Sequence, residues 1–146
     1  IVKKVDRTLE VLLAGSSDSE DAKGIIERLN QKRASLILNP SDSFVNYLYG
    51  LTTHFVLASN RETLGIVALE AAVAGCIPLV KRNKGISSYL PEQLIFDDLC
   101  SFEEKLYHVI QPNFSKKIYL ELEDLREKLL PEKTLLELEK IYMRVL

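Results

Sequence analysis

The chain has 146 residues, of which 47% are apolar and 27% are charged, and its net charge is −2. This composition is typical of a single globular domain with a hydrophobic core, and the charge argues against the basic surface that nucleic-acid binding requires. No apolar run approaches the roughly 20 residues of a membrane span, and two cysteines make neither a disulfide framework nor a zinc site. We therefore expect one domain, residues 1–146, in a reducing cytoplasmic setting.

The first third of the chain alternates apolar runs with signals for helices. Leu9–Ala14 is an apolar run that stops at a Gly-Ser-Ser turn, which predicts a buried strand. The acids around Asp18 favour a helix start, with an apolar stripe at Ile25, Ile26 and Leu29. Ala34–Leu38 is the next predicted strand, and it ends at Asn39-Pro40. A helix is expected from Ser41 onward, with a buried side formed by Phe44, Val45, Tyr47 and Leu48.

The remainder of the chain continues this alternation. Three more strands are predicted, at His54–Ala58, Ile77–Val80 and Leu94–Phe96. The predicted helices cover 63–74, 101 or 102 to 110, 115–130 and 132–146, and Pro131 separates the last two. Strands that alternate with helices across short links predict a doubly wound α/β fold with a parallel sheet. The strands are apolar throughout rather than alternating, which agrees with burial on both faces.

The polar segment after the third strand is the strongest candidate for a ligand site. Open α/β sheets bind ligands beyond the carboxyl ends of their strands, and Ser59–Gly65 leads from such an end into a helix. The free N–H groups and the dipole of a helix N-terminus favour an anion such as a diphosphate. Gly65 removes a side chain where a ligand could approach closely.

Glu62 and Glu70 lie in this segment with seven residues between them. On a helix that starts at residue 63 they would be roughly 12 Å apart along the axis, a spacing that suits two ends of a long polyhydroxylated ligand. Glu70 is flanked by Leu69 and Ala71, where a buried charge needs a partner or a ligand. Ordinary alternatives stay open, since Glu62 could be a first-turn helix acid and Glu70 a solvated helix position.

Around the two glutamates runs the string Ser59-x-x-Glu62-Thr63-Leu64-Gly65-x-x-x-Leu69-Glu70-Ala71, followed by Ala74-Gly75 and Pro78-Leu79-Val80. It resembles the signature of the retaining glycosyltransferases of the GT-B fold, in the large family 4 group. That signature reads Pro-Ser, Glu-Gly-Phe-Gly, Leu-Glu-Ala and Gly-x-Pro-Val. Thr63 and Leu64 depart from it, where the family has Gly and Phe. Further similar stretches lie at Leu12–Gly15, Tyr47–Tyr49, Gly85–Ser88 and 141–146.

The resemblance implies a Rossmann-like domain, one half of a GT-B fold, that binds a nucleotide-sugar donor. Glu70 would bind the ribose hydroxyls, and Glu62, the catalytic candidate, would contact hydroxyls of the donor sugar. The backbone N–H groups of Thr63, Leu64 and Gly65 would meet the sugar and the phosphates.

The resemblance also assigns residues at the neighbouring strand ends. Leu38 and Asn39 would lie near the base, and Lys81 and Gly85 would line the adjacent strand end. The closing helices would cover residues 115–146. No metal and no cofactor are implied beyond the nucleotide diphosphate sugar, which is a substrate.

Two parts of the family's pattern are not found in these residues. One is the acceptor-binding half, which often supplies a histidine at the reacting centre. The other is the first strand–helix unit, whose basic pair binds the phosphates and for which Lys81, Lys84 or Arg61 could partly substitute. We therefore expect a fragment of a two-domain hexosyltransferase-like enzyme that binds nucleotide but transfers no sugar alone. Contact with a membrane surface would come through the missing half, and no nucleic-acid partner is expected.

Two alternatives from other classes stay open. A receiver-like signalling domain has the same doubly wound fold, with acids after the first strand and Lys81 after the fourth. Asn39, however, stands where the phospho-accepting aspartate is expected. A dinucleotide-binding oxidoreductase domain would need G-x-G-x-x-G after its first strand, whereas this chain has Ala14-Gly15-Ser16-Ser17.

Overall fold

The computed structural model describes residues 10–15, 24, 34–60, 62 and 64–129. Two compact units, residues 1–51 and 52–146, divide the chain, and each is described by itself. The stripe predicted at Ile25, Ile26 and Leu29 and the helix predicted over 132–146 lie outside the described residues.

In the first unit, β1 (Val11–Gly15) and β2 (Ala34–Leu38) pair in parallel, with Val11 opposite Ala34 and Gly15 opposite Leu38. The bounds of β2 are those predicted, whereas β1 begins two residues later than expected. Burial on both faces is not found for β1, which is exposed from Leu12 onward. A strand is buried on both faces only where layers cover both, and the described residues of this unit supply two strands and α3 (Asp42–Leu51).

Helix α3 begins at Asp42, within the predicted Ser41–Ser43 start, and the Ser41 Oγ before it accepts a hydrogen bond from the Phe44 N–H at 3.3 Å. Its buried residues are Leu48 and Tyr49, whereas Phe44 and Tyr47 are 40% and 59% exposed. The predicted buried side was therefore wrong in part. Apolar residues occupy most of the circumference of this helix, so periodicity alone does not select the face that packs.

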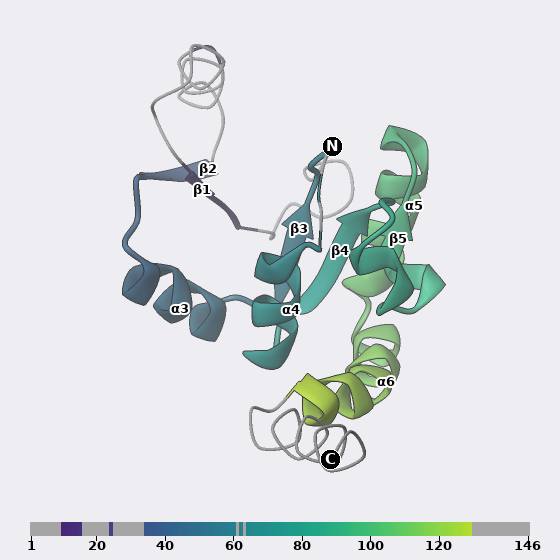
Figure 1. Ribbon diagram of the computed structural model, residues 1–146. Helices are drawn as coiled ribbons and strands as arrows, with labels where there is room; N and C mark the ends of the chain where they lie inside the picture. Colours follow the sequence, from purple (N-terminus) through teal and green to yellow (C-terminus); the bar gives the residue numbers. More distant parts are fainter. Residues whose placement is uncertain (1–9, 16–23, 25–33, 61, 63, 130–146) are drawn as a thin grey trace, which may run out of the picture. The chain divides into compact units, whose positions relative to one another are not determined.

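In the second unit, three parallel strands form a sheet in the order β3 (His54–Leu57), β4 (Ile77–Lys81), β5 (Ile95–Phe96). Figure 1 shows β4 between the other two. The first four residues of β4 are buried, as a strand covered on both faces requires. The mixture of parallel strands and helices agrees with the predicted Rossmann-like α/β class.

Helices cover this sheet in the second unit. Helix α4 (Ile66–Val73) follows β3 and packs on β3 and β4, and α5 (Leu99–Val109) follows β5 and packs on β4 and β5. Helix α6 (Pro112–Leu129) packs against α4, α5 and β4. Two short 3₁₀ turns, η1 (Ile86–Ser88) and η2 (Glu92–Leu94), connect β4 to β5. Among the described helices, none has the length and apolar character needed to cross a bilayer.

Helix α5 begins earlier than predicted because Asp98 is its N-cap. The Asp98 carboxylate accepts a hydrogen bond from the Ser101 N–H at 2.8 Å, and the Ser101 Oγ accepts one from the Asp98 N–H at 3.0 Å. This capping box satisfies N–H groups at the start of the helix. The hydrogen bonds from the Ser101 backbone and then its side chain lower the pKa of Asp98 below its ordinary value of 3.8.

Asp98→Ala is expected to lower the thermal midpoint of unfolding at neutral pH, because the helix loses its cap. A carboxyl whose pKa is lowered by folding stabilises the fold above its unfolded pKa and loses that contribution as pH falls through the folded value. The difference between wild type and Asp98→Ala should therefore shrink below about pH 4. Asp98→Asn, which caps without titrating, is the matched control for calorimetry across pH. A difference that stays constant down to pH 2 would contradict this assignment.

Candidate functional site

The loop between β3 and α4 differs from its prediction in one informative way. Helix α4 begins at Ile66 rather than residue 63, because Gly65 has a left-handed backbone with φ 71° and ψ 40°. Glu62 is half-buried on this loop, and the first turn of α4 contains no acid. The alternative of a first-turn helix acid is thereby excluded for Glu62.

Glu70 lies in the second turn of α4, and its side chain is exposed. The buried side of this helix is formed by Ala68, Ala71 and Ala72. The prediction that Glu70 is a buried charge in apolar surroundings was therefore wrong, because Glu70 lies on the exposed side of α4, away from the buried alanines. The estimate of 12 Å along one axis also fails, since Glu62 is outside the helix. Glu70 is accessible to a ligand, but an exposed carboxylate is solvated and does not require a ligand or a partner.

Two contacts join this loop to the last residue of β4 and to the turn that follows β4. At its start, the Lys81 Nζ donates a hydrogen bond to the Asn60 Oδ1. At its end, Gly65 is buried against Ile86, and a Cβ added to Gly65 would lie 2.8 Å from the Ile86 Cβ. Both ends of the Glu62 loop are thus held by the neighbouring strand end. This is where ligands of parallel α/β sheets bind.

The segment after β4 is a turn organised by Asn83. The N–H groups of Gly85 and Ile86 each donate to the Asn83 Oδ1 at 3.1 Å. Asn60, Asn83 and Ile86 were not among the predicted site residues. The tripeptide pattern Asn-x-Gly after a strand could have indicated Asn83, since asparagine side chains commonly bond the backbone two residues on.

The basic residues at this strand end differ in their partners. Arg82 bonds Asp97 and Glu92, and these contacts raise the pKa of Arg82. The hydrogen bond from Arg82 in turn lowers the pKa of Glu92. Lys81, by contrast, contacts the neutral amide of Asn60. Among the residues that the structure describes, Lys81 has no carboxylate partner, so its positive charge remains available to an anion at the loop, whereas that of Arg82 is offset by two carboxylates.

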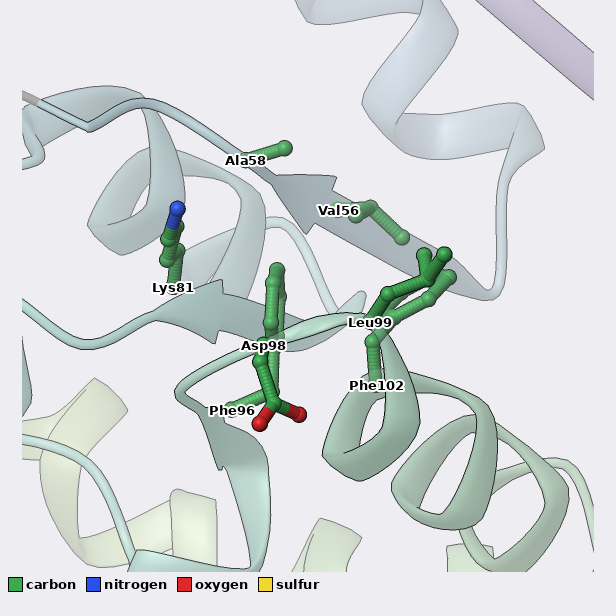
Figure 2. A pocket seen from close by; sticks show the side chains of 7 residues that line it. All are labelled: Val56, Ala58, Lys81, Phe96, Asp98, Leu99 and Phe102. Carbon is green, nitrogen blue, oxygen red and sulfur yellow. The ribbon is translucent and has the colours of Figure 1, made fainter.

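A pocket of about 290 Å³ opens beside Lys81 on the second unit (Figure 2). Its lining is mostly apolar: Val56, Ala58, Lys81, Phe96, Asp98, Leu99 and Phe102. Figure 2 shows the Leu99 side chain pointing toward Val56, whereas the carboxylate of Asp98 points away from Val56. The lining has two charged residues, Lys81 and Asp98. The carboxylate of Asp98 is engaged in capping α5, which leaves Lys81 as the charged group that a ligand in the pocket could contact.

The other predicted site residues fall in three places. Leu38 and Asn39 lie at the carboxyl end of β2 in the first unit, and Asn39 has a φ of 48°. Leu64, in the second unit, is exposed, and Gly85 is half-buried. Thr63 lies outside the described residues. Asn39 donates its N–H to the Gly15 carbonyl at 2.8 Å, which extends the β1–β2 ladder by one bond.

A known protein family matches more than half of the chain. The family described as glycosyl transferases group 1 matches residues 1–94, which include both glutamates, Lys81 and the Asn83 turn. No curated protein matches the chain. The family match favours a sugar transferase over the receiver-like and dinucleotide-binding alternatives.

Proposed function

Because the chain belongs to the glycosyl transferases group 1 family, we propose that it is the donor-binding half of a GT-B enzyme. The intact hexosyltransferase would move a sugar from a nucleotide diphosphate to an acceptor with retained anomeric configuration. Its second, acceptor-binding domain would complete the site, so this chain alone would bind the donor without transferring its sugar.

The observation that carries the proposal is the start of α4. This N-terminus has no side-chain cap and no acid in its first turn, and it follows a loop that Lys81 contacts through Asn60. Uncapped N–H groups and the helix dipole favour an anion, and Lys81 adds a cation beside them. These groups would stabilise the charge that develops on the diphosphate as its bond to the sugar breaks.

The two glutamates divide the remaining contacts in this proposal. Glu62, held on the loop, would accept hydrogen bonds from the donor sugar, and exposed Glu70 would accept them from the ribose diol. Leu38 and Asn39 would contact the base, and Gly85 would line the phosphate side. The donor is the substrate, and no resident cofactor or metal is part of the proposal. The enzyme would act in the cytoplasm, with membrane-surface contact through its other half.

Calorimetric titration of the chain with UDP, GDP, ADP and their glucose conjugates tests this function. We expect one nucleotide series to bind and Glu70→Gln to weaken that binding about 10- to 100-fold, since hydrogen bonds to a charged acceptor are lost. Glu104→Gln, on the exposed side of α5, is the matched control and should bind like wild type. Absence of binding for every nucleotide at millimolar concentration would reject the proposal, as would equal affinities for the two variants.

A further inference from the structure

The side chain of Asn83 closes the turn after β4 with three hydrogen bonds. Its Oδ1 accepts from the N–H groups of Gly85 and Ile86 at 3.1 Å, and its Nδ2 donates to the Lys81 carbonyl at 3.0 Å. The backbone N–H of Asn83 donates to the Ser87 Oγ at 3.0 Å. A primary amide can make all three bonds at once because its acceptor oxygen, with two lone pairs, and its donor nitrogen are separate atoms. The path of the turn from Lys81 to Ile86 therefore depends on this side chain.

The turn places Ile86 against Gly65, which lies at the end of the loop before α4. Ile86 is fully buried, and its Cβ, Cγ2 and Cγ1 lie 2.8, 3.1 and 3.3 Å from the position of a Cβ on Gly65. Ile86 thus fills the space beside Gly65 and leaves no room for a side chain there. A displacement of Ile86 would leave a void next to Gly65, which close-packed interiors do not retain without rearrangement.

Gly65 is the N-cap residue, directly before the first residue of α4. Its carbonyl accepts hydrogen bonds from the N–H groups of Ala68 at 2.9 Å and Leu69 at 3.3 Å. The direction of the uncapped N–H groups in the first turn therefore follows the placement of Gly65. A continuous series of contacts runs from Asn83 through Ile86 and Gly65 to the N-terminus of α4.

We propose that Asn83 is a positioning residue for the diphosphate of the donor, acting through Ile86 and Gly65 on the start of α4. This inference rests on the proposed function. It assigns Asn83 no contact with the ligand. Glu70 is one turn beyond the start of α4, so the ribose contact does not depend on Asn83 to the same degree.

The test compares binding of the nucleoside diphosphate with binding of the same nucleoside, by calorimetry and by ligand-observed NMR. Asn83→Ala should weaken diphosphate binding about tenfold, from the loss of turn hydrogen bonds, and change nucleoside binding less than twofold. Asn83→Ser keeps one acceptor and should lie between alanine and wild type. Serine is preferred to aspartate because a carboxylate would repel the diphosphate directly. Asn113→Ala, at an exposed position of α6, is the control.

The outcomes distinguish a positioning role of Asn83 from a general effect on folding and from no role in binding. A loss shared equally by the diphosphate and the nucleoside would indicate a general effect on folding and would overturn the inference. Unchanged diphosphate binding in both variants would overturn it as well, while leaving the proposed function in place. Failure of the wild-type chain to bind any nucleoside diphosphate would remove the proposed function and this inference together. If Asn83→Ala does not fold, the Asn83→Ser comparison decides alone.

Discussion

Gly65→Ala is expected to destabilise the second unit by about 2–5 kcal/mol. Part of the cost is the left-handed backbone at φ 71°, which costs an L-residue roughly 1–2 kcal/mol. The rest is crowding, because the new Cβ would lie 2.8 Å from the buried Ile86 Cβ, and overpacking typically costs about 1–3 kcal/mol. Chemical denaturation of the purified chain measures the change in the free energy of unfolding.

Two further variants make the Gly65 experiment specific. Gly50→Ala, on α3, meets no atom within 4 Å and should stabilise that helix by about 0.5–1 kcal/mol. In the Gly65→Ala background, Ile86→Ala should cost less than it does in the wild type, since it removes Cγ2 and Cγ1, two of the three Ile86 atoms that crowd the new Cβ. If Gly65→Ala unfolds at the wild-type denaturant concentration, the close packing of these two loops is incorrect.

Leu122→Ala is expected to cost about 2–5 kcal/mol, because Leu122 of α6 is fully buried and its loss leaves a cavity. Helix α6 contacts α4, α5 and β4, so it belongs to the core of the second unit. The same experiment with Leu120→Ala, which alters a side chain that is 60% exposed, should change the free energy of unfolding by less than about 0.5 kcal/mol.

Equal effects of the two leucine variants would contradict the packing of α6. The pair is well matched, since both positions lie in the middle of one helix and both substitutions favour helix formation. Their difference therefore isolates burial from helix propensity. A measured difference of several kcal/mol would identify α6 as part of the second unit rather than as an appended helix.

The strands were the part of the fold most open to prediction. Both ends of β2 agree with the apolar run from Ala34 to Leu38, since Asn39-Pro40 stops the strand sharply. Strand β4 agrees to within one residue, for the same reason: Gly75 precedes it, and polar residues follow it. Short buried strands bounded by turn residues leave little freedom in where they begin and end.

Helix starts were predicted less well. Helix α6 begins at Pro112 rather than at residue 115, and the errors for α4 and α5 have local causes. Helix α4 starts three residues late because the Gly65 backbone is left-handed, which the sequence permits but does not require. Helix α5 starts early because Asp98 forms a capping box with Ser101. Asp97 and Asp98 are both suitable N-cap residues. The sequence does not show which of them has the extended backbone that an N-cap residue needs.

By itself, the sequence determined the α/β class, the family signature and the loop in which Glu62 lies. These follow from apolar runs, turn residues and spacings, which act over a few neighbouring positions. Only the tertiary structure decided that Glu70 is exposed, that Lys81 contacts Asn60 and that Ile86 packs on Gly65. The physical reason is that these contacts join residues about 20 positions apart, and the pairing of β3 with β4 is what brings them together.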